Sequence, residues 1–333
     1  MKIGLYIAAV IGIGLTVAII IYTNAALVLD TVLSQGLVGI VAVVSFHAVP
    51  LVFSAGAWWV VTRPDWPSGF WAFMRARILR EAVNDLLPTA QLGGPLAGAR
   101  LLILQGAPGL PVAASLFVDL TLEVLSELVF AFIGIGLLAL DGRAPEAVRI
   151  ALIGTAILGP AVIAFVMAQR VGLVHMIDRA ARNMFKKFGY DQGEAAQSLH
   201  DAVWRSYGRK GTVAVSFGLH VLCWILGAGE IWLAFYFLGH PVTIAEALIL
   251  ESLGQAIRSA AFVVPAGLGV QEGGFILLGT AFGLPPSLSL AMSLTKRVRE
   301  IVFGGVSLLA WQIVEGRNFA RVLREPGQTA TGK

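Results

Sequence analysis

Long apolar runs separated by short polar segments make up most of this chain. About 20 predominantly apolar residues in a row are enough for a helix to cross a bilayer. Apolar residues follow one another continuously in these runs, whereas they alternate with polar ones in the strands of membrane barrels. The pattern therefore predicts an all-α polytopic membrane protein with about six spanning helices. The predicted spans are residues 3–22, 37–61, 111–140, 148–169, 211–238 and 287–314.

Two stretches, residues 80–100 and 258–274, break this pattern because they combine charges and prolines with closely spaced glycines. Irregular backbone occurs at membrane depth only where it is buried in protein or lines a cavity, since an unpaired backbone group in hydrocarbon costs several kcal/mol. We therefore predict two re-entrant helical hairpins, one within residues 70–110 and one within residues 244–282. The residues predicted to form their turns are Pro88, Gly93, Gly94, Pro265, Gly267 and Gly269.

The segments around the two breaks also correspond in order. Pro88 matches Pro265, 177 residues later, and Val129 matches Val302, 173 residues later, so short gaps suffice to align the two halves. Broken hydrophobic segments at matching places in two halves are the best sequence pointer to the binding site of a transporter. The sequence thus predicts an internal repeat. A chance likeness among membrane sequences rich in leucine, alanine and glycine is the alternative.

Composition and charge placement add a membrane orientation. The 333 residues are 57% hydrophobic and 13% charged, whereas soluble domains carry about 25% charged residues. Lysine and arginine gather in residues 62–80, 170–210 and 316–333 and are absent from residues 23–36 and 239–245. By the positive-inside rule the basic segments and both termini are cytoplasmic. The small net charge of +4 follows from this placement, and no nucleic-acid partner is expected.

This orientation makes the first hairpin enter from the cytoplasmic face and the second from the external face, so the two repeats have opposite topology. Inverted repeats around a site near the midplane are common in transporters that alternate access. The predicted division of the chain is an N-terminal helical hairpin (1–69), a first repeat (70–169), a basic cytoplasmic loop (170–210), a second repeat (211–315) and a cytoplasmic tail (316–333).

Ionisable residues inside the apolar runs are costly and therefore usually functional. Asp119, Glu123 and Glu127 lie four residues apart and share one face of a helix. The corresponding segment of the second repeat carries three bases, so we expect the acids of one repeat to pair with the bases of the other across a pseudo-two-fold axis. These bases are Lys296, Arg297 and Arg299.

Glu81 likewise corresponds to Arg258, which again opposes an acid to a base. These charges and their polar neighbours are interpreted as a path for a lipid headgroup or a proton relay. A purely structural network of ion pairs between helices is the alternative. The further members of the predicted path are Arg80, Asn84, Gln91, Arg100, Glu251, Gln271 and Glu272.

No constellation of catalytic residues is found. The histidines lack the HExxH spacing of zinc proteases and have no nearby cysteine pair, because Cys223 is the only cysteine. A phosphate-binding P-loop is absent, and Gly267 and Gly269 lie outside any strand–helix context for a dinucleotide site. We therefore expect no metal, no cofactor and no enzymatic activity. The histidines are His47, His175, His200, His220 and His240.

Two motifs carry a resemblance to a known family. The run Pro-Ala-Gly-Leu-Gly-Val-Gln-Glu-Gly at residues 265–273, together with an earlier and looser motif, resembles the flippase-like membrane domain of lysylphosphatidylglycerol synthases and their stand-alone relatives, over roughly residues 70–315. Many relatives have a Gly-Glu pair after the first proline, where this chain has Gly93, Gly94 and Pro95, so no acidic headgroup contact is carried over there. The looser motif comprises Arg80, Glu81, Asn84, Leu87, Pro88, Gly93, Gly94 and Arg100.

Within that superfamily, the run Pro-Thr-Ala-Gln-Leu-Gly-Gly at residues 88–94 and the chain length are similar to hopanoid-biosynthesis-associated membrane proteins. The resemblance implies a lipid translocase or lipid-handling transporter of the bacterial inner membrane, with hopanoid or another amphipathic lipid as cargo. The aminoacyl-transferring domain of the synthases is not among these residues, which argues against an enzyme.

The predicted mechanism keeps the apolar part of a lipid in the bilayer while its polar head crosses a cavity between the two repeats. One alternative is a non-transporting partner that assembles or stabilises lipid-biosynthesis enzymes, and another is an enzyme that modifies a lipid headgroup. A basic loop without a polar cavity would favour the scaffold. A cluster of acid, base and nucleophile in one pocket would favour the enzyme.

Overall fold

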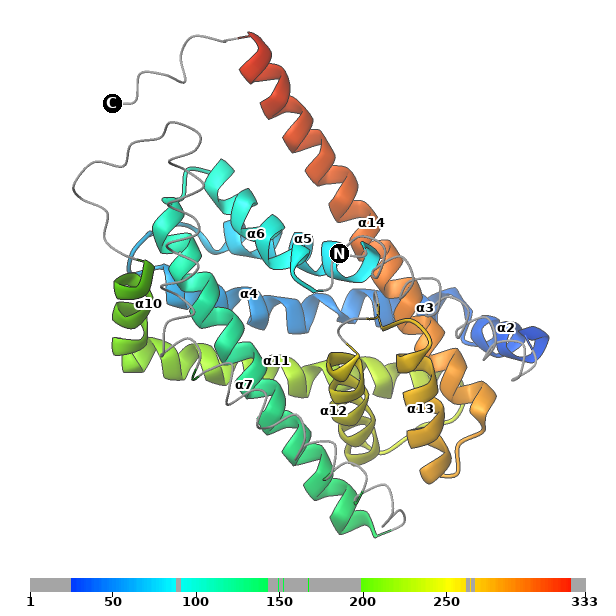
Figure 1. The fold of residues 1–333 in the computed structure, drawn as a ribbon. Helices are drawn as coiled ribbons and strands as arrows, with labels where there is room; N and C mark the ends of the chain where they lie inside the picture. The colour runs from blue at the N-terminus through cyan, green and yellow to red at the C-terminus, as the bar shows by residue number, and fades with distance from the viewer. Residues whose placement is uncertain are drawn as a thin grey trace.

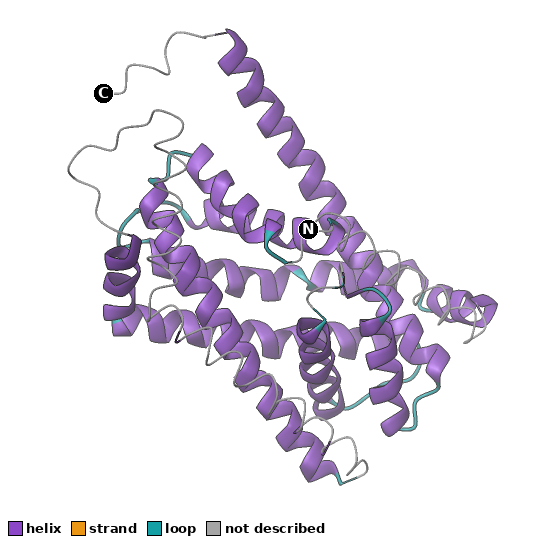
Figure 2. Ribbon diagram, in the orientation of Figure 1, coloured by secondary structure: helices purple, strands orange, loops and turns teal. Residues whose placement is uncertain are grey.

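The computed structural model describes residues 25–87, 91–142, 199–261, 264 and 267–324, together with residues 149, 152 and 167. Within this part of the chain every regular element is a helix (Figures 1 and 2), as the apolar runs predict. Outside the described residues lie the predicted span 3–22, nearly all of the predicted span 148–169, the turn residues Pro88 and Pro265, most of the 170–210 loop and the end of the tail.

The helices fall into two groups along the chain. The first group comprises α2 (Ala25–Ser34), α3 (Gly36–Phe46), α4 (Ala48–Thr62), α5 (Phe70–Leu86), α6 (Gly93–Leu104) and α7 (Gly109–Asp141). The second group comprises α10 (Leu199–Gly208), α11 (Lys210–Phe237), α12 (Ile244–Ala260), α13 (Val270–Ala281) and α14 (Pro286–Arg324).

Three helical segments of the described residues are long and apolar enough to cross a membrane: Gly36–Thr62, which joins α3 and α4, Gly109–Asp141, and Lys210–Phe237. They coincide with three of the six predicted spans. α14 covers a fourth but carries charged residues from Lys296 to Glu300 in its first half. The total of six spans and the re-entrant entry of the hairpins therefore stay predictions.

Helix ends around both breaks follow from local sequence. Leu87, the residue after α5, has an extended backbone with φ −113° and ψ 140°, which is the conformation favoured before a proline. Gly269, the residue before α13, has φ 76°, a conformation that residues with a side chain rarely adopt. Each apolar segment is thereby divided into two shorter helices.

The same succession of helices occurs twice. α5 and α12 each have 17 residues, α6 and α13 each have 12, and each pair is followed by one long helix. The two halves exchange contacts: α7 packs against α12, while α14 packs against α5. α4 and α11 run side by side through the middle (Figure 1). This arrangement agrees with the internal repeat, whereas its boundaries and opposite topology stay predictions.

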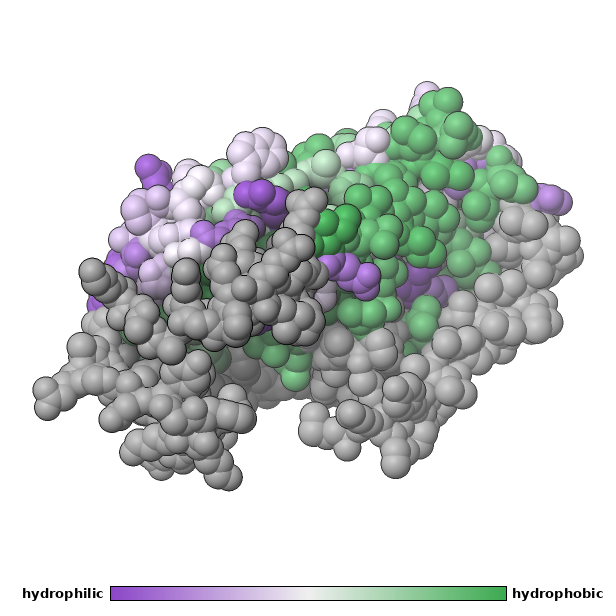
Figure 3. Space-filling view, turned by 90° about the horizontal axis from the view of Figure 1, so that it is seen from above, coloured by the Kyte–Doolittle hydropathy of each residue, from purple (hydrophilic) through white to green (hydrophobic). Residues whose placement is uncertain are grey.

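The outer surface is strongly apolar. Val302, Val306, Leu309 and Ile313 form an exposed stripe along α14 at helical spacing, and Figure 3 shows a broad hydrophobic area beside a more hydrophilic end. Exposed apolar patches of this extent mark interaction or membrane surfaces. Together with the three candidate spans, this surface indicates contact with lipid tails.

One ion pair outside the spans gives a pH-dependent prediction. Arg209, just before α11, donates two hydrogen bonds of 2.6 Å to Asp65 in the α4–α5 connection. These bonds stabilise the carboxylate and hold the pKa of Asp65 below its ordinary value. The pair therefore stabilises the fold above about pH 4 and loses this effect as pH falls through the lowered pKa of Asp65.

We expect Arg209→Met to reduce stability at pH 7 by at most about 1 kcal/mol, because both side chains are partly solvated. Thermal unfolding in detergent should show this deficit at pH 7 and a smaller one in acid, once the pH has fallen through the lowered pKa of Asp65. The double variant Asp65→Asn/Arg209→Met is the control. A deficit of equal size at both pH values would contradict the assignment.

Candidate functional site

A cavity of about 450 Å³ lies between the two halves and is called the central cavity below. Its walls come from α5 and α7 of the first half, from α11, α12 and α14 of the second, and from the α3–α4 junction at His47. Its charged and amide side chains are Arg77, Arg80, Glu81, Asn84, Asp85, Gln91, Glu123, Glu127, Glu230, Glu251, Gln255, Arg258, Lys296 and Arg299.

Most of the predicted polar path lines this cavity. Asp119 and Gln271 lie behind the lining and contact its arginines, while Glu272 and Arg297 pair with each other at 2.8 Å. Arg100 is exposed on α6 and does not belong to the lining. The predicted residues that line the cavity are Arg80, Glu81, Asn84, Gln91, Glu123, Glu127, Glu251, Arg258, Lys296 and Arg299.

The predicted turn glycines lie at the helix starts of the two breaks. Gly93 and Gly94 begin α6, and the N–H of Gly94 donates to Oδ1 of Asn84 at 3.1 Å. Gly267 and Gly269 have φ values of 62° and 76°, which glycine adopts without strain. The side chain of Glu272 returns to the N–H of Gly269 at 2.7 Å and caps α13. Gly94 in the first turn of α6 and Gly269 just before α13 are buried.

In the first half, two arginines of α5 meet two acids of α7. Arg80 donates to Oδ2 of Asp119 at 2.9 Å and also to Glu123. Arg77 donates to the other oxygen of Glu123 at 2.7 Å. Nε2 of His220, on α11, lies 3.0 Å from the second oxygen of Asp119, which is completely buried. Both acids are therefore neutralised within their own half.

The second half has an equivalent network with the charges distributed differently. Lys296 of α14 donates to Glu251 of α12 at 2.6 Å. Arg297 donates to Glu272 at 2.8 Å and to Glu300 at 2.7 Å. Removing one partner of a buried ion pair of this kind strongly destabilises the folded protein, because the remaining charge stays buried without a partner.

The predicted pairing of Asp119, Glu123 and Glu127 with the three bases of α14 is therefore wrong. The reason is helix packing: α7 packs against α12, and α14 packs against α5, so the two equivalent helices do not meet in an extensive contact. The acids of α7 instead receive Arg77 and Arg80.

The pairing of Glu81 with Arg258 is also wrong. Arg258 donates to Glu300 at 2.8 Å and, across the halves, to Asp85. Asp85 lies one helical turn after Glu81 and thus on the same side of α5. An acid of one half does meet a base of the other here, but four residues away from the predicted position.

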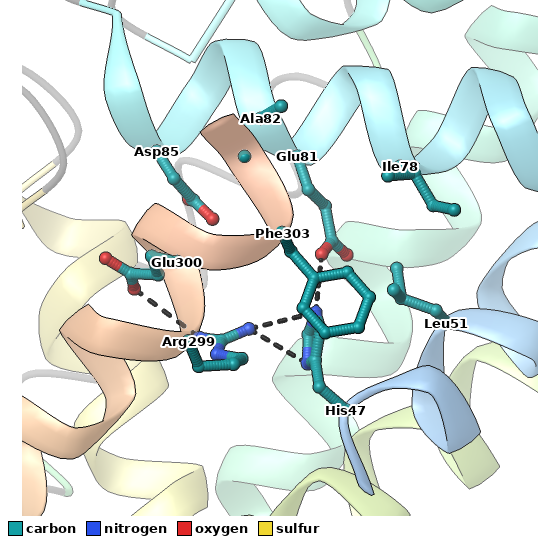
Figure 4. Close-up of a pocket in the computed structure, with 10 residues that line it drawn as sticks. His47, Leu51, Ile78, Glu81, Ala82, Asp85, Arg299, Glu300 and Phe303 are labelled. Carbon is teal, nitrogen blue, oxygen red and sulfur yellow. Dashed lines mark hydrogen bonds and ion pairs between the residues drawn. The ribbon is translucent and has the colours of Figure 1, made fainter. Parts of the chain in front are cut away.

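His47 links the two halves, and Figure 4 shows its contacts with Glu81 and Arg299. Its Nε2 lies 3.0 Å from Oε2 of Glu81, and its Nδ1 lies 2.7 Å from Oε1 of Glu230. Nη1 of Arg299 lies 2.9 Å from the same Nδ1. His47, Glu81 and Arg299 line a small cavity of about 10 Å³ together with Asp85, about the size that holds one water molecule.

Sequence reasoning missed several of these residues. His47 shows no metal-ligand spacing in the sequence, and Glu230 stands alone in its apolar run, so neither is assigned to the predicted path. Arg77 and Asp85 had a usable signal, because they lie three and four residues from Arg80 and Glu81 on the same helix. Intramembrane histidines therefore merit the same attention as carboxylates when a polar path is traced.

The lining is nearly balanced in charge. Among the described residues it contains five basic side chains (Arg77, Arg80, Arg258, Lys296 and Arg299) and six acidic ones (Glu81, Asp85, Glu123, Glu127, Glu230 and Glu251). Such a cavity offers both donors and acceptors to a polar group without a strong field of one sign. No group of three potential metal ligands occurs among the residues that the structure describes.

Comparison with known proteins places this fold in a family. Neither curated proteins nor solved structures gave a match to the chain. The family model described as the lysylphosphatidylglycerol synthase TM region matches residues 7–307. This match covers nearly the whole chain, including both broken stretches and every described residue of the central cavity. The chain therefore belongs to the lysylphosphatidylglycerol synthase TM region family.

Proposed function

We propose that this protein is a lipid translocase or lipid-handling transporter of the bacterial inner membrane. The central cavity, with a polar lining drawn from both halves, is the observation that carries the proposal. Family membership supports a membrane protein that handles lipids. The polar head of the lipid crosses the cavity, while its apolar part stays in contact with the exposed apolar surface of the helices.

The charge balance of the lining favours a head without net charge. A strongly charged head would have to displace partners from pairs such as Lys296–Glu251, which costs more than hydrogen bonding to neutral groups. The amides of Asn84, Gln91 and Gln255 also line the cavity and can bond hydroxyl groups. A hydroxylated hopanoid, the cargo that the sequence resemblance implies, has this chemistry.

Contacts between the halves support alternating access. Asp85–Arg258 and His47–Glu230 join groups from the two halves. Pairs such as Arg80–Asp119 and Lys296–Glu251 lie within one half and can persist while the halves rock. Rocking of one repeat against the other around a fixed site is the usual motion of transporters built from inverted repeats.

The two alternatives have less support. A scaffold for lipid-biosynthesis enzymes has no need of a charged cavity lined by both halves. For an enzyme, Ser259 and Cys223 are the candidate nucleophiles of the lining, but nucleophilic catalysis needs an oriented base within hydrogen-bond reach. In the described residues, Ser259 donates to the carboxylate of Glu127, but no third side chain orients that carboxylate in turn, and His47 and His220 contact carboxylates rather than either nucleophile. We therefore propose that the protein is not an enzyme.

The first test is lipid movement in vesicles that contain the purified protein. A fluorescent lipid in the inner leaflet should become accessible to a membrane-impermeant reductant faster than in protein-free vesicles. Ala256→Trp, on the cavity wall, should abolish most of this movement because an indole fills the space through which the head passes. Leu277→Trp, on an exposed position of α13, is the matched control and should retain it.

Equal rates in protein-containing and protein-free vesicles would refute translocation. Cargo is tested separately by analysing each leaflet in cells with and without the gene. A change confined to hopanoids would support them as cargo. Unchanged asymmetry of hopanoids, with a change in a phospholipid, would assign the phospholipid instead.

A further inference from the structure

Glu127 differs from every other acid that the described residues contribute to the central cavity. Each of the other acids has an arginine or lysine at ion-pair distance. Glu127 has no such cation, and its hydrogen-bond partner is the hydroxyl of Ser259 on α12. The contact joins α7 of the first half to α12 of the second. The other acids of the central cavity, which do have such a cation, are Glu81, Asp85, Glu123, Glu230 and Glu251.

A hydroxyl suits a carboxyl group that changes its protonation state. When Glu127 is ionised, Ser259 donates its proton to the carboxylate, and when Glu127 is protonated, the same oxygen can accept from it. A guanidinium has no acceptor and stabilises only the ionised form, as it does at Glu123. The Glu127–Ser259 contact therefore persists in both states.

The charged surroundings do not fix Glu127 in its ionised form. Two charges act on it most directly: Glu123, one turn earlier on α7, disfavours a second negative charge, and Arg258 on α12 favours it. Arg258 is already engaged by Asp85 and Glu300. The other titratable groups that line the cavity are His47 before α4; Arg77, Arg80, Glu81 and Asp85 on α5; Cys223 and Glu230 on α11; Glu251 on α12; and Lys296 and Arg299 on α14.

Glu127 lies near the middle of α7, which is one of the candidate spans. An unpaired carboxyl group at this depth is more stable when neutral, because a hydrocarbon environment penalises the charged form. Polar access through the cavity nevertheless allows exchange with water. Glu127 can thus bind or release a proton, and water from each side of the membrane has access to it in turn as the halves rock.

We propose that Glu127 is a proton-binding site and that the proton is the coupling ion for movement of the lipid head. This inference rests on the transport function proposed above. Glu127 takes up one proton from water in the cavity when it opens to one side, and forms a neutral carboxylic acid. It releases the same proton to water on the other side, and no other bond is made or broken.

The proton site can be tested without transport. Dicyclohexylcarbodiimide reacts with protonated carboxyl groups in apolar surroundings, and mass spectrometry of the purified protein locates the product. We expect labelling of Glu127 that declines from about pH 5 to about pH 9, and little labelling of the ion-paired Glu123 at any of these values. Glu127→Gln should lose the label, and Ser259→Ala should keep it. Labelling of Glu127 no greater than that of Glu123 would overturn the proposal.

Coupling is tested in the vesicles described above with an imposed pH gradient and the membrane voltage held at zero. For one proton per uncharged lipid, a gradient of one pH unit shifts the equilibrium ratio of lipid between leaflets up to about tenfold. Glu127→Gln should abolish this shift. Wild-type movement that ignores the gradient would overturn the coupling while leaving transport intact. If the wild type moves no lipid at all, the transport function falls, and the labelling experiment alone decides the proton site.

Discussion

Replacing Arg80 with methionine should destabilise the protein by about 3–5 kcal/mol, the usual effect of breaking a buried ion pair from one side. Arg80 is buried and donates to both Asp119 and Glu123. Methionine keeps most of the side-chain volume, so the loss reflects charge rather than packing. Thermal or denaturant unfolding in detergent, together with the yield of folded protein, measures the effect.

The matched control is Arg75→Met on the same helix. Arg75 is exposed and bonds only the backbone of Trp71 one turn earlier, so its replacement should change stability by no more than about 0.5 kcal/mol. If the two methionine variants were equally stable, the first-half network would not hold α5 and α7 together.

Double-mutant cycles then test the pairing itself. Glu123→Gln should couple strongly with Arg80→Met, because the two side chains share a hydrogen bond. It should be additive with Arg297→Met, because Arg297 bonds Glu272 of α13 and Glu300 of α14, whereas Glu123 bonds Arg77 and Arg80 of α5. Strong coupling between positions 123 and 297 would restore the pairing expected from the sequence.

The sequence predicts where the helices and their breaks lie, but it does not predict which charged side chains pair with each other. Continuous apolar runs located three spans, and the prolines and glycines near residues 88–94 and 265–269 located both breaks. These features depend on local backbone chemistry, which a single sequence contains. Most of the ionisable residues that line the central cavity could also be found in the sequence, because an ionisable residue in an apolar run has few places to lie except a protein interior.

Pairing could not be derived in the same way. The spacing of Asp119 and Glu123 places them on one face of α7, but it does not say which helix faces them. That depends on the exchange of contacts between halves, in which α7 packs against α12 and α14 against α5. Equivalent positions in a repeat need not lie close together, since α7 and α14 each pack mainly against helices of the opposite half. Glu127 fits the same picture, since its partner Ser259 lies on α12.

Replacing Gly94 with alanine should destabilise the protein by about 1–3 kcal/mol, the range of overpacking in a well-packed interior. A Cβ at this position would lie 2.2 Å from the backbone oxygen of Arg80 and 2.4 Å from Oδ1 of Asn84. Rotation of a side chain cannot relieve a clash with backbone, so α6 has to move away from α5. The hydrogen bond from the N–H of Gly94 to Asn84 is then lengthened or lost. Thermal unfolding in detergent measures the change.

Gly136→Ala on α7 is the control, because a Cβ there meets no atom within 4 Å. It should be neutral or stabilising by up to about 1 kcal/mol, since alanine favours helix more than glycine does. The two variants differ further in function. Arg80 and Asn84 both line the central cavity, so displacement of α6 at Gly94 disturbs the cavity wall as well as the fold. We therefore expect the Gly94 variant to move lipid more slowly than the Gly136 variant even at temperatures where both are fully folded. Equal stability and equal rates would show that close approach of α6 to α5 has no part in shaping the cavity.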